Sequence, residues 1–278
     1  MSYLTWRPMV CIFILAAISS GLYAVDGVVL IDQNSALAGY VTSADAPGFP
    51  VTISQSGSYR LSGNLTVPDL NTTAIQITAD FVTLDLNGFS IIGPAVCAGS
   101  PMKCSAPGKG TGVQAAGDEP FGPRGVRVLN GSVRGMGLMG IWMTGDGSFV
   151  SRVNVDSNAG GGMSVAGSVI ESAASHNGSF GIIGITVRDS TAVQNLGDGI
   201  ILATGGVATG NSSSSNGGYG LYVQFGTATG NALFVNKSFG ISALCPSSIV
   251  GNTVAGSEVG SIETSGAGCV LANNATRP

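Results

Sequence analysis

Residues 177–184, Asn-Gly-Ser-Phe-Gly-Ile-Ile-Gly, contain the pattern that decides the fold: an Asn, three variable residues, a Gly and an apolar residue. The pattern occurs five times in succession, and its asparagines are separated by 19, 18, 21 and 20 residues. These are Asn158, Asn177, Asn195, Asn216 and Asn236. A repeat of about 20 residues predicts a solenoid in which each turn of the chain, here called a coil, stacks on the preceding one.

Other positions of the repeat have the alternation of a β-strand. The residue eight before each Asn is apolar in every copy, from Val150 and Val169 to Ala228. We therefore expect short strands with one face turned inward. Identical residues of a parallel stack lie one above another, so the five asparagines should form a ladder in which each amide donates to the next. The repeated Gly permits a corner conformation that a β-carbon would strain.

The Asn-x-x-x-Gly-Ile coil resembles that of the right-handed parallel β-helix, the pectin-lyase-like fold. Residues 51–61 and 75–88 look like the opening coils of secreted bacterial β-helix repeat proteins. The resemblance implies an all-β solenoid over residues 25–278. We expect an N-terminal cap and first coils at 25–92, a disulfide-pinned loop at 93–123, regular coils at 124–262 and a short C-terminal end at 263–278. Members of this fold include polysaccharide lyases, glycoside hydrolases, epimerases and adhesins, so the fold does not specify an activity.

The composition agrees with stacked coils and excludes several other classes. Of the 278 residues, 9% are charged and 44 are Gly. A helical bundle needs charged helix formers on its solvent faces, and collagen needs a Gly at every third position. The net charge of −4 argues against a nucleic-acid partner.

Residues 1–24 have the features of a secretory signal peptide. Arg7 provides a positive charge, residues 9–18 are an apolar run, and Ala24 ends a passable cleavage site. The apolar run is short for a membrane span, and no later segment is long and apolar enough for one. We expect a secreted protein, extracellular or periplasmic, without a membrane span after signal removal.

Four cysteines remain once the signal, with Cys11, is removed. They allow three disulfide pairings. The local pairing, Cys97 with Cys104 and Cys245 with Cys269, is favoured because each bond would close a loop in a proline-containing region. A zinc site is disfavoured because no C-x-x-C spacing occurs. We expect neither a metal nor a cofactor.

Counting six residues back from the ladder asparagines gives a column of charged residues. Arg152, Glu171 and Asp189 fall on successive coils, with Arg188 beside Asp189. Glu171 and Asp189 would lie one coil apart, and two close carboxylates raise one pKa, as a general acid requires. The alternative is a solvent-facing column in which Arg152 pairs with Glu171 and Arg188 with Asp189. The lone His176 would join such a site only by reaching one of these carboxylates.

The residue six after each Asn should face outward between two inward neighbours. These positions, with the preceding copy, hold Trp142, Ser164, Ile183, Ile201, Tyr222 and Ser242. Three after the Asn come Phe180, Asp198, Tyr219 and Phe239. We take Trp142, Ile183, Ile201, Tyr222 and Tyr219 as the candidate binding residues, because aromatic rings on a solenoid suit stacking against sugars. The alternative is that these side chains pack under a loop or against a second chain.

Together these observations favour a non-catalytic surface or matrix protein that binds a polysaccharide, a cell-surface glycan or another partner. The scarcity of ionisable residues supports this interpretation, because no acid–base cluster converges. The alternative is a polysaccharide lyase or glycoside hydrolase acting on an acidic polysaccharide through Glu171, Asp189, Arg152 or Arg188. A structural spacer without a ligand is a third hypothesis.

Overall fold

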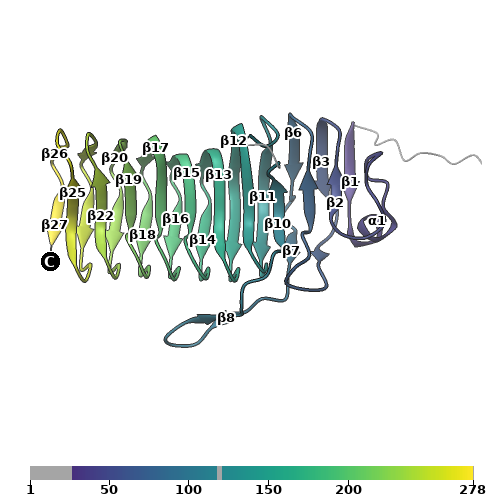
Figure 1. The fold of residues 1–278 in the computed structure, drawn as a ribbon, viewed down its shortest axis with the longest axis horizontal. Coiled ribbons are helices and arrows are strands. Elements are labelled where there is room, and N and C mark those ends of the chain that lie inside the picture. The colour runs from purple at the N-terminus through teal and green to yellow at the C-terminus, as the bar shows by residue number, and fades with distance from the viewer. Residues whose placement is uncertain (1–26, 118–120, 278) are drawn as a thin grey trace, which may run out of the picture.

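The computed structural model describes residues 27–117 and 121–277 and shows a parallel β-solenoid (Figure 1). It has about 11 turns of about 21 residues each and almost no helix. The expected signal peptide at residues 1–24 lies outside the described residues. Each coil contributes strands to three faces, and each strand pairs in parallel with its equivalent in the next coil.

Face 1 carries the apolar residue that follows the repeated Gly. Its register joins Ile141 to Met163, Met163 to Ile182, and Ile182 to Ile200. Its strands are β2(Val51–Ile53), β5(Ile75–Ile77), β10(Thr111–Ala115), the first parts of β12(Met139–Asp156), β13(Gly161–Ile170), β15(Ile182–Arg188) and β17(Ile200–Thr209), then β19(Leu221–Gln224), β22(Phe239–Leu244) and β25(Gly260–Ser265).

Face 2 follows face 1 in each regular coil, and the long strands β12, β13, β15 and β17 bend into it. Its other strands are β1(Val28–Ile31), β3(Gly57–Leu61), β6(Val82–Asp85), the first part of β11(Arg127–Arg134), β20(Thr227–Thr229), β23(Ser248–Val250) and β26(Val270–Ala272).

Face 3 closes the coil with short strands. They are β4(Leu65–Thr66), β7(Ser90–Ile92), the last parts of β11 and β12, β14(Ala173–Ser175), β16(Thr191–Val193), β18(Ser212–Ser214), β21(Ala232–Phe234), β24(Thr253–Ala255) and β27(Ala275–Arg277).

The core lies between the three faces and consists of stacked apolar columns. The positions eight before each Asn point inward on face 2, where Val150, Val169, Val187, Ala208 and Ala228 are fully buried. Burying a valine side chain contributes about 1.5–3 kcal/mol, so such a column stabilises the stack at every coil.

The N-terminal end is covered by the helix α1(Gln33–Ala38) (Figure 1). A capping box starts it, in which Asp32 Oδ1 accepts from Ser35 N and Ser35 Oγ accepts from Asp32 N, both at 2.8 Å. Ala36 is fully buried against the first coils. This cap shields the core at an end where no preceding coil does so.

Two of the expected segments contain strands of the stack. The region 93–123 is not one continuous loop, because β10 lies inside it and pairs with β5 and β12. Val113 and Ala115 are buried there, and the surrounding Gly and Pro concealed this short alternation. In the segment that follows residue 262, β26 and β27 pair with β23 and β24 and add a further coil.

Both disulfides have the favoured local pairing. Cys97 bonds to Cys104, and this bond joins the antiparallel pair β8(Cys97–Ala98) and β9(Lys103–Cys104). Cys245 bonds to Cys269 and ties the turn after β22 to the turn after β25. Figure 1 shows the β8 hairpin as an arm that projects from the stack.

Candidate functional site

The outer surface of face 1 carries a continuous column of side chains, one from each coil. Trp142, Ser164, Ile183, Ile201 and Tyr222 are successive partners in the strand register, and all five are partly exposed. The next member, Ser242, was expected outside but is only 7% exposed and bonds through Oγ to Glu263 Oε2 at 3.1 Å. The column therefore presents an apolar and aromatic strip along the solenoid axis.

A second column adds rings at the start of face 1. It contains Phe180, Asp198, Tyr219 and Phe239, all partly exposed. The rings of Tyr219 and Tyr222 stack, with centroids 5.7 Å apart and planes 17° apart. A β-carbon on Gly161 would collide with the ring of Phe180, and one on Gly260 with the ring of Phe239. These glycines let the rings lie over the backbone of the neighbouring coil.

Asp198 is a member of this second column that was not assigned to a site from the sequence. Its Oδ1 accepts the backbone N–H of Tyr219 at 2.7 Å. Partial burial raises the pKa of the Asp198 carboxyl, and the Tyr219 hydrogen bond opposes this rise only in part. Its position three residues after a ladder Asn was visible in the sequence, but its partial burial was not.

The charged column lies away from this surface, at the corner between faces 2 and 3. Arg152, Glu171 and Asp189 have φ of 54°, 49° and 49°, so each occupies the left-handed conformation that turns the chain. Later coils place Gly210, Gly230 and Gly251 at this position. The column is a turn position, and its side chains are exposed.

The side chains of this column form separate ion pairs. Arg152 Nη1 lies 3.7 Å from Glu171 Oε2, and Arg188 Nε lies 3.3 Å from Asp189 Oδ2. The two carboxylates occupy neighbouring coils, and each faces an arginine. The alternative, a solvent-facing column of ion pairs, describes the geometry.

The five predicted asparagines are buried at the corner between faces 3 and 1. The Nδ2 of each of the first four donates to the Oδ1 of the next Asn at 2.8–3.0 Å. A second ladder, not seen in the sequence, fills the corner between faces 2 and 3. It contains Asn211, Asn231, Asn252 and Asn274, with the same amide-to-amide bonds at 2.9–3.0 Å. Its signal was the Gly-Asn pair at 210–211, 230–231 and 251–252.

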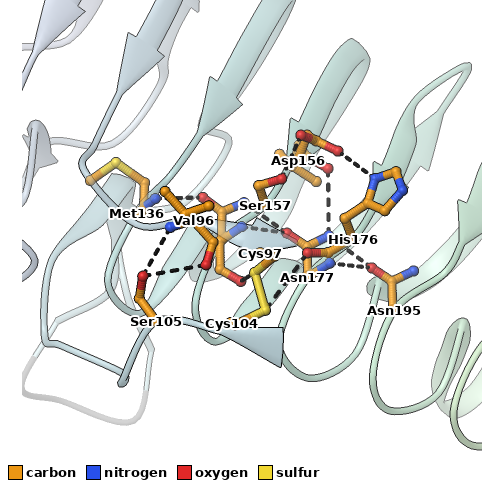
Figure 2. The surroundings of a disulfide bond; sticks show 12 residues. Val96, Cys97, Cys104, Ser105, Met136, Asp156, Ser157, His176, Asn177 and Asn195 are labelled. Atoms are coloured by element: carbon orange, nitrogen blue, oxygen red, sulfur yellow. Dashed lines mark hydrogen bonds and ion pairs between the residues drawn. A yellow bond between two sulfur atoms is a disulfide. The ribbon is translucent and has the colours of Figure 1, made fainter. Parts of the chain in front are cut away.

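His176 joins neither Glu171 nor Asp189. Its Nδ1 lies 2.9 Å from Asp156 Oδ1, and its Nε2 lies 2.9 Å from Gln194 Oε1. Figure 2 shows His176 and Asp156 beside the Cys97–Cys104 disulfide and the Asn ladder. Partial burial alone would raise the pKa of Asp156, but hydrogen bonds from His176, Ser175 and Ser157 outweigh it and hold this pKa below its usual value. The group is a corner network around one carboxylate.

Metal and membrane features are absent from the parts of the chain that the structure describes. Within residues 27–117 and 121–277, no three His, Cys, Asp or Glu side chains are placed to hold one ion. No helix among these residues is long and apolar enough to cross a bilayer.

No protein-family model and no curated protein matches the chain. Solved structures do resemble it. The A-module of the Azotobacter vinelandii mannuronan C-5 epimerase AlgE6 has a TM-score of 0.60 and 17% identity, over 79% of this chain and 67% of the module. The AlgE4 A-module from the same organism has a TM-score of 0.54 and 16% identity, over 84% of this chain and 77% of the module.

The Dettilon tailspike protein is also similar, with a TM-score of 0.58 and 15% identity, over 82% of this chain and 54% of the tailspike chain. At such low identities the likeness is one of fold. The geometry and these neighbours agree: the chain is a right-handed parallel β-helix.

Proposed function

We propose that this chain is a non-catalytic glycan-binding β-helix and that a polysaccharide lies along the outer surface of face 1. The observation that carries the proposal is the in-register strip of Trp142, Ile183, Ile201 and Tyr222, with Tyr219 stacked on Tyr222. Ile183, Ile201 and Tyr222 lie on three successive coils, roughly 4.8 Å apart, and Trp142 lies beyond Ser164 on the same column, so the strip offers repeated apolar contacts to a repeating polymer.

Two further observations support a glycan partner outside the cytosol. Two of the structural neighbours are named as mannuronan epimerases, so the same fold is used by proteins that act on a polysaccharide. The two disulfides suit an oxidising compartment, which agrees with an extracellular or periplasmic location.

A polysaccharide lyase or glycoside hydrolase remains the alternative. It receives less support, because Glu171 and Asp189 lie at the corner between faces 2 and 3, away from the outer surface of face 1, and face Arg152 and Arg188. A general acid commonly sits in a buried site, whereas both of these carboxyls are more than half exposed and each lies beside an arginine.

The test is a panel of polysaccharides measured for both binding and product formation. Trp142→Ala and Tyr222→Ala should each weaken binding roughly 2- to 12-fold, because a ring contact contributes about 0.5–1.5 kcal/mol beyond its buried area. Phe234→Ala is the matched control, since Phe234 is an exposed ring on face 3. Product formation would contradict the non-catalytic role, and equal losses in all three variants would contradict the placement on face 1.

A further inference from the structure

The two outer columns of face 1 are almost free of charge. Between Met139 and Ser242 they contain Gly161, Ser164, Ser242, apolar and aromatic residues, and one carboxyl, Asp198. Basic side chains are absent from both columns over this range. Lys237 lies two coils beyond the Asp198 coil and at the corner, one residue after the ladder. Over this range the surface offers a polymer rings and one carboxylate, but no cation; the next residue of the first column, Glu263, adds a second carboxylate.

Asp198 sits in the middle of this surface without a counter-charge. Its coil bonds to the Phe180 coil on one side and to the Tyr219 coil on the other. One carboxylate oxygen accepts the Tyr219 N–H, and no ion pair joins Asp198 to a cation among residues 27–117 and 121–277. The other oxygen has capacity to accept a hydroxyl hydrogen bond from a ligand.

Two classes of glycan would meet this arrangement differently. A neutral sugar can stack its apolar face on the rings and donate a hydroxyl to the free oxygen of Asp198. A uronate or sulfated sugar would bring its own negative charge to a half-buried carboxylate. Like charges in a partly desolvated site repel more strongly than in bulk water, and no cation offsets the repulsion.

We propose that face 1 binds neutral glycans and that Asp198 is the residue that excludes acidic ones. This inference rests on the proposed glycan-binding role and names its ligand class. It predicts a ligand chemistry different from the polyuronate named for the two epimerase neighbours.

The test compares polymers that differ in the acidic group. A 1,4-linked mannan and mannuronan share linkage and sugar stereochemistry and differ at carbon 6, and a neutral galactan and polygalacturonate give a second contrast. Calorimetric Kd values at one fixed ionic strength should favour the neutral polymer at least tenfold. Asp198→Asn keeps an acceptor for the Tyr219 N–H and removes the charge, so it should improve binding of the acidic polymer at least fivefold.

Controls separate this inference from the proposed function. Glu258→Gln removes an exposed charge from the corner three coils away and should leave the neutral-to-acidic ratio unchanged. Equal binding of both polymers, with no effect of Asp198→Asn, would overturn the charge exclusion and leave glycan binding intact. Failure of all four polymers to bind folded protein, with self-association detected by light scattering, would overturn both.

Discussion

The two asparagine ladders occupy the two corners of face 3. In one of them serine replaces asparagine toward the C-terminal end of the stack, and in the other toward the N-terminal end. The ladder between faces 3 and 1 begins at Asn158 and ends at Asn236, and its next position is Ser257, whose Oγ is buried without a partner among the described residues. The ladder between faces 2 and 3 begins with Ser172 and Ser190 and becomes asparagine at Asn211. At each corner, serine occupies the ladder position in coils whose other corner carries asparagine.

The difference shows what the asparagine adds. Serine can accept the preceding backbone N–H, as Ser172 Oγ does from Val153 N at 3.2 Å. Its one hydroxyl donor then goes to the local carbonyl of Ile170. An asparagine also accepts that N–H, but its two amide donors reach both the next Asn and a core-facing carbonyl, as Asn195 Nδ2 reaches Asn216 and Ala174 O. At these two corners both residues accept a backbone N–H from the preceding coil, but only asparagine adds an amide-to-amide bond to the next coil.

Breaking the first ladder in its middle should have the largest effect. Asn195→Ala would leave the backbone N and the Nδ2 of Asn177 buried without their acceptor. Each buried unsatisfied donor costs about 1–3 kcal/mol, so we expect a loss of about 3 kcal/mol in the free energy of unfolding. Urea unfolding followed by circular dichroism measures it.

Ser190→Ala is the matched change at the other corner. It removes a single acceptor, that of Ser172 N, and should lose about 1 kcal/mol. Equal losses for the two variants would mean that the amide-to-amide links add nothing to the backbone contacts.

The sequence predicted the fold and one ladder, because the repeated Asn-x-x-x-Gly pattern can be recognised from residue spacing alone. The second ladder was missed because its first members are serines and because the turn position before it changes from Arg152 and Glu171 to glycine. The same charged residues satisfy the sequence pattern of a candidate site. Their left-handed φ depends on the corner geometry, which spacing alone does not reveal. The partial burial of Asp198 likewise depends on the neighbouring coils.

Extending the first ladder should stabilise the protein. Ser257→Asn places an amide at the position after Asn236, where its Oδ1 can accept from Asn236 and its Nδ2 can replace an unpaired hydroxyl. We expect a gain of about 1 kcal/mol, read from the same urea transition. Ser257→Ala is the control and should change stability by less than half as much. A Ser257→Asn variant no more stable than the alanine variant would show that the ladder ends there for steric reasons.

Replacing Glu171 by Gly tests the turn position before the second ladder. An L-residue in the left-handed conformation costs about 1–2 kcal/mol, whereas glycine adopts it freely but loses more entropy on folding. The exposed ion pair with Arg152 contributes about 0–1 kcal/mol. We therefore expect Glu171→Gly to be up to about 1 kcal/mol more stable, with unchanged glycan binding. A loss of both stability and glycan binding would mean that Glu171 has a functional role in addition to its place in the turn.

The smallest predicted effect is on the pH dependence of stability, and it arises at the corner between faces 3 and 1, where His176 contacts Asp156. Hydrogen bonds from His176, Ser175 and Ser157 outweigh burial and lower the pKa of Asp156 in the folded protein. The folded state therefore binds this proton more weakly than the unfolded chain, whose Asp pKa is about 3.9. The stabilisation is complete above that pH and is lost as pH falls through the folded pKa. Because the Asp156 side chain is 42% exposed, solvent screening keeps the contribution small.

Urea midpoints between pH 6 and pH 3 should fall more steeply for the wild type than for Asp156→Asn. Parallel curves would mean that the network orients His176 without stabilising the fold, and the two corners would then differ only in their ladders.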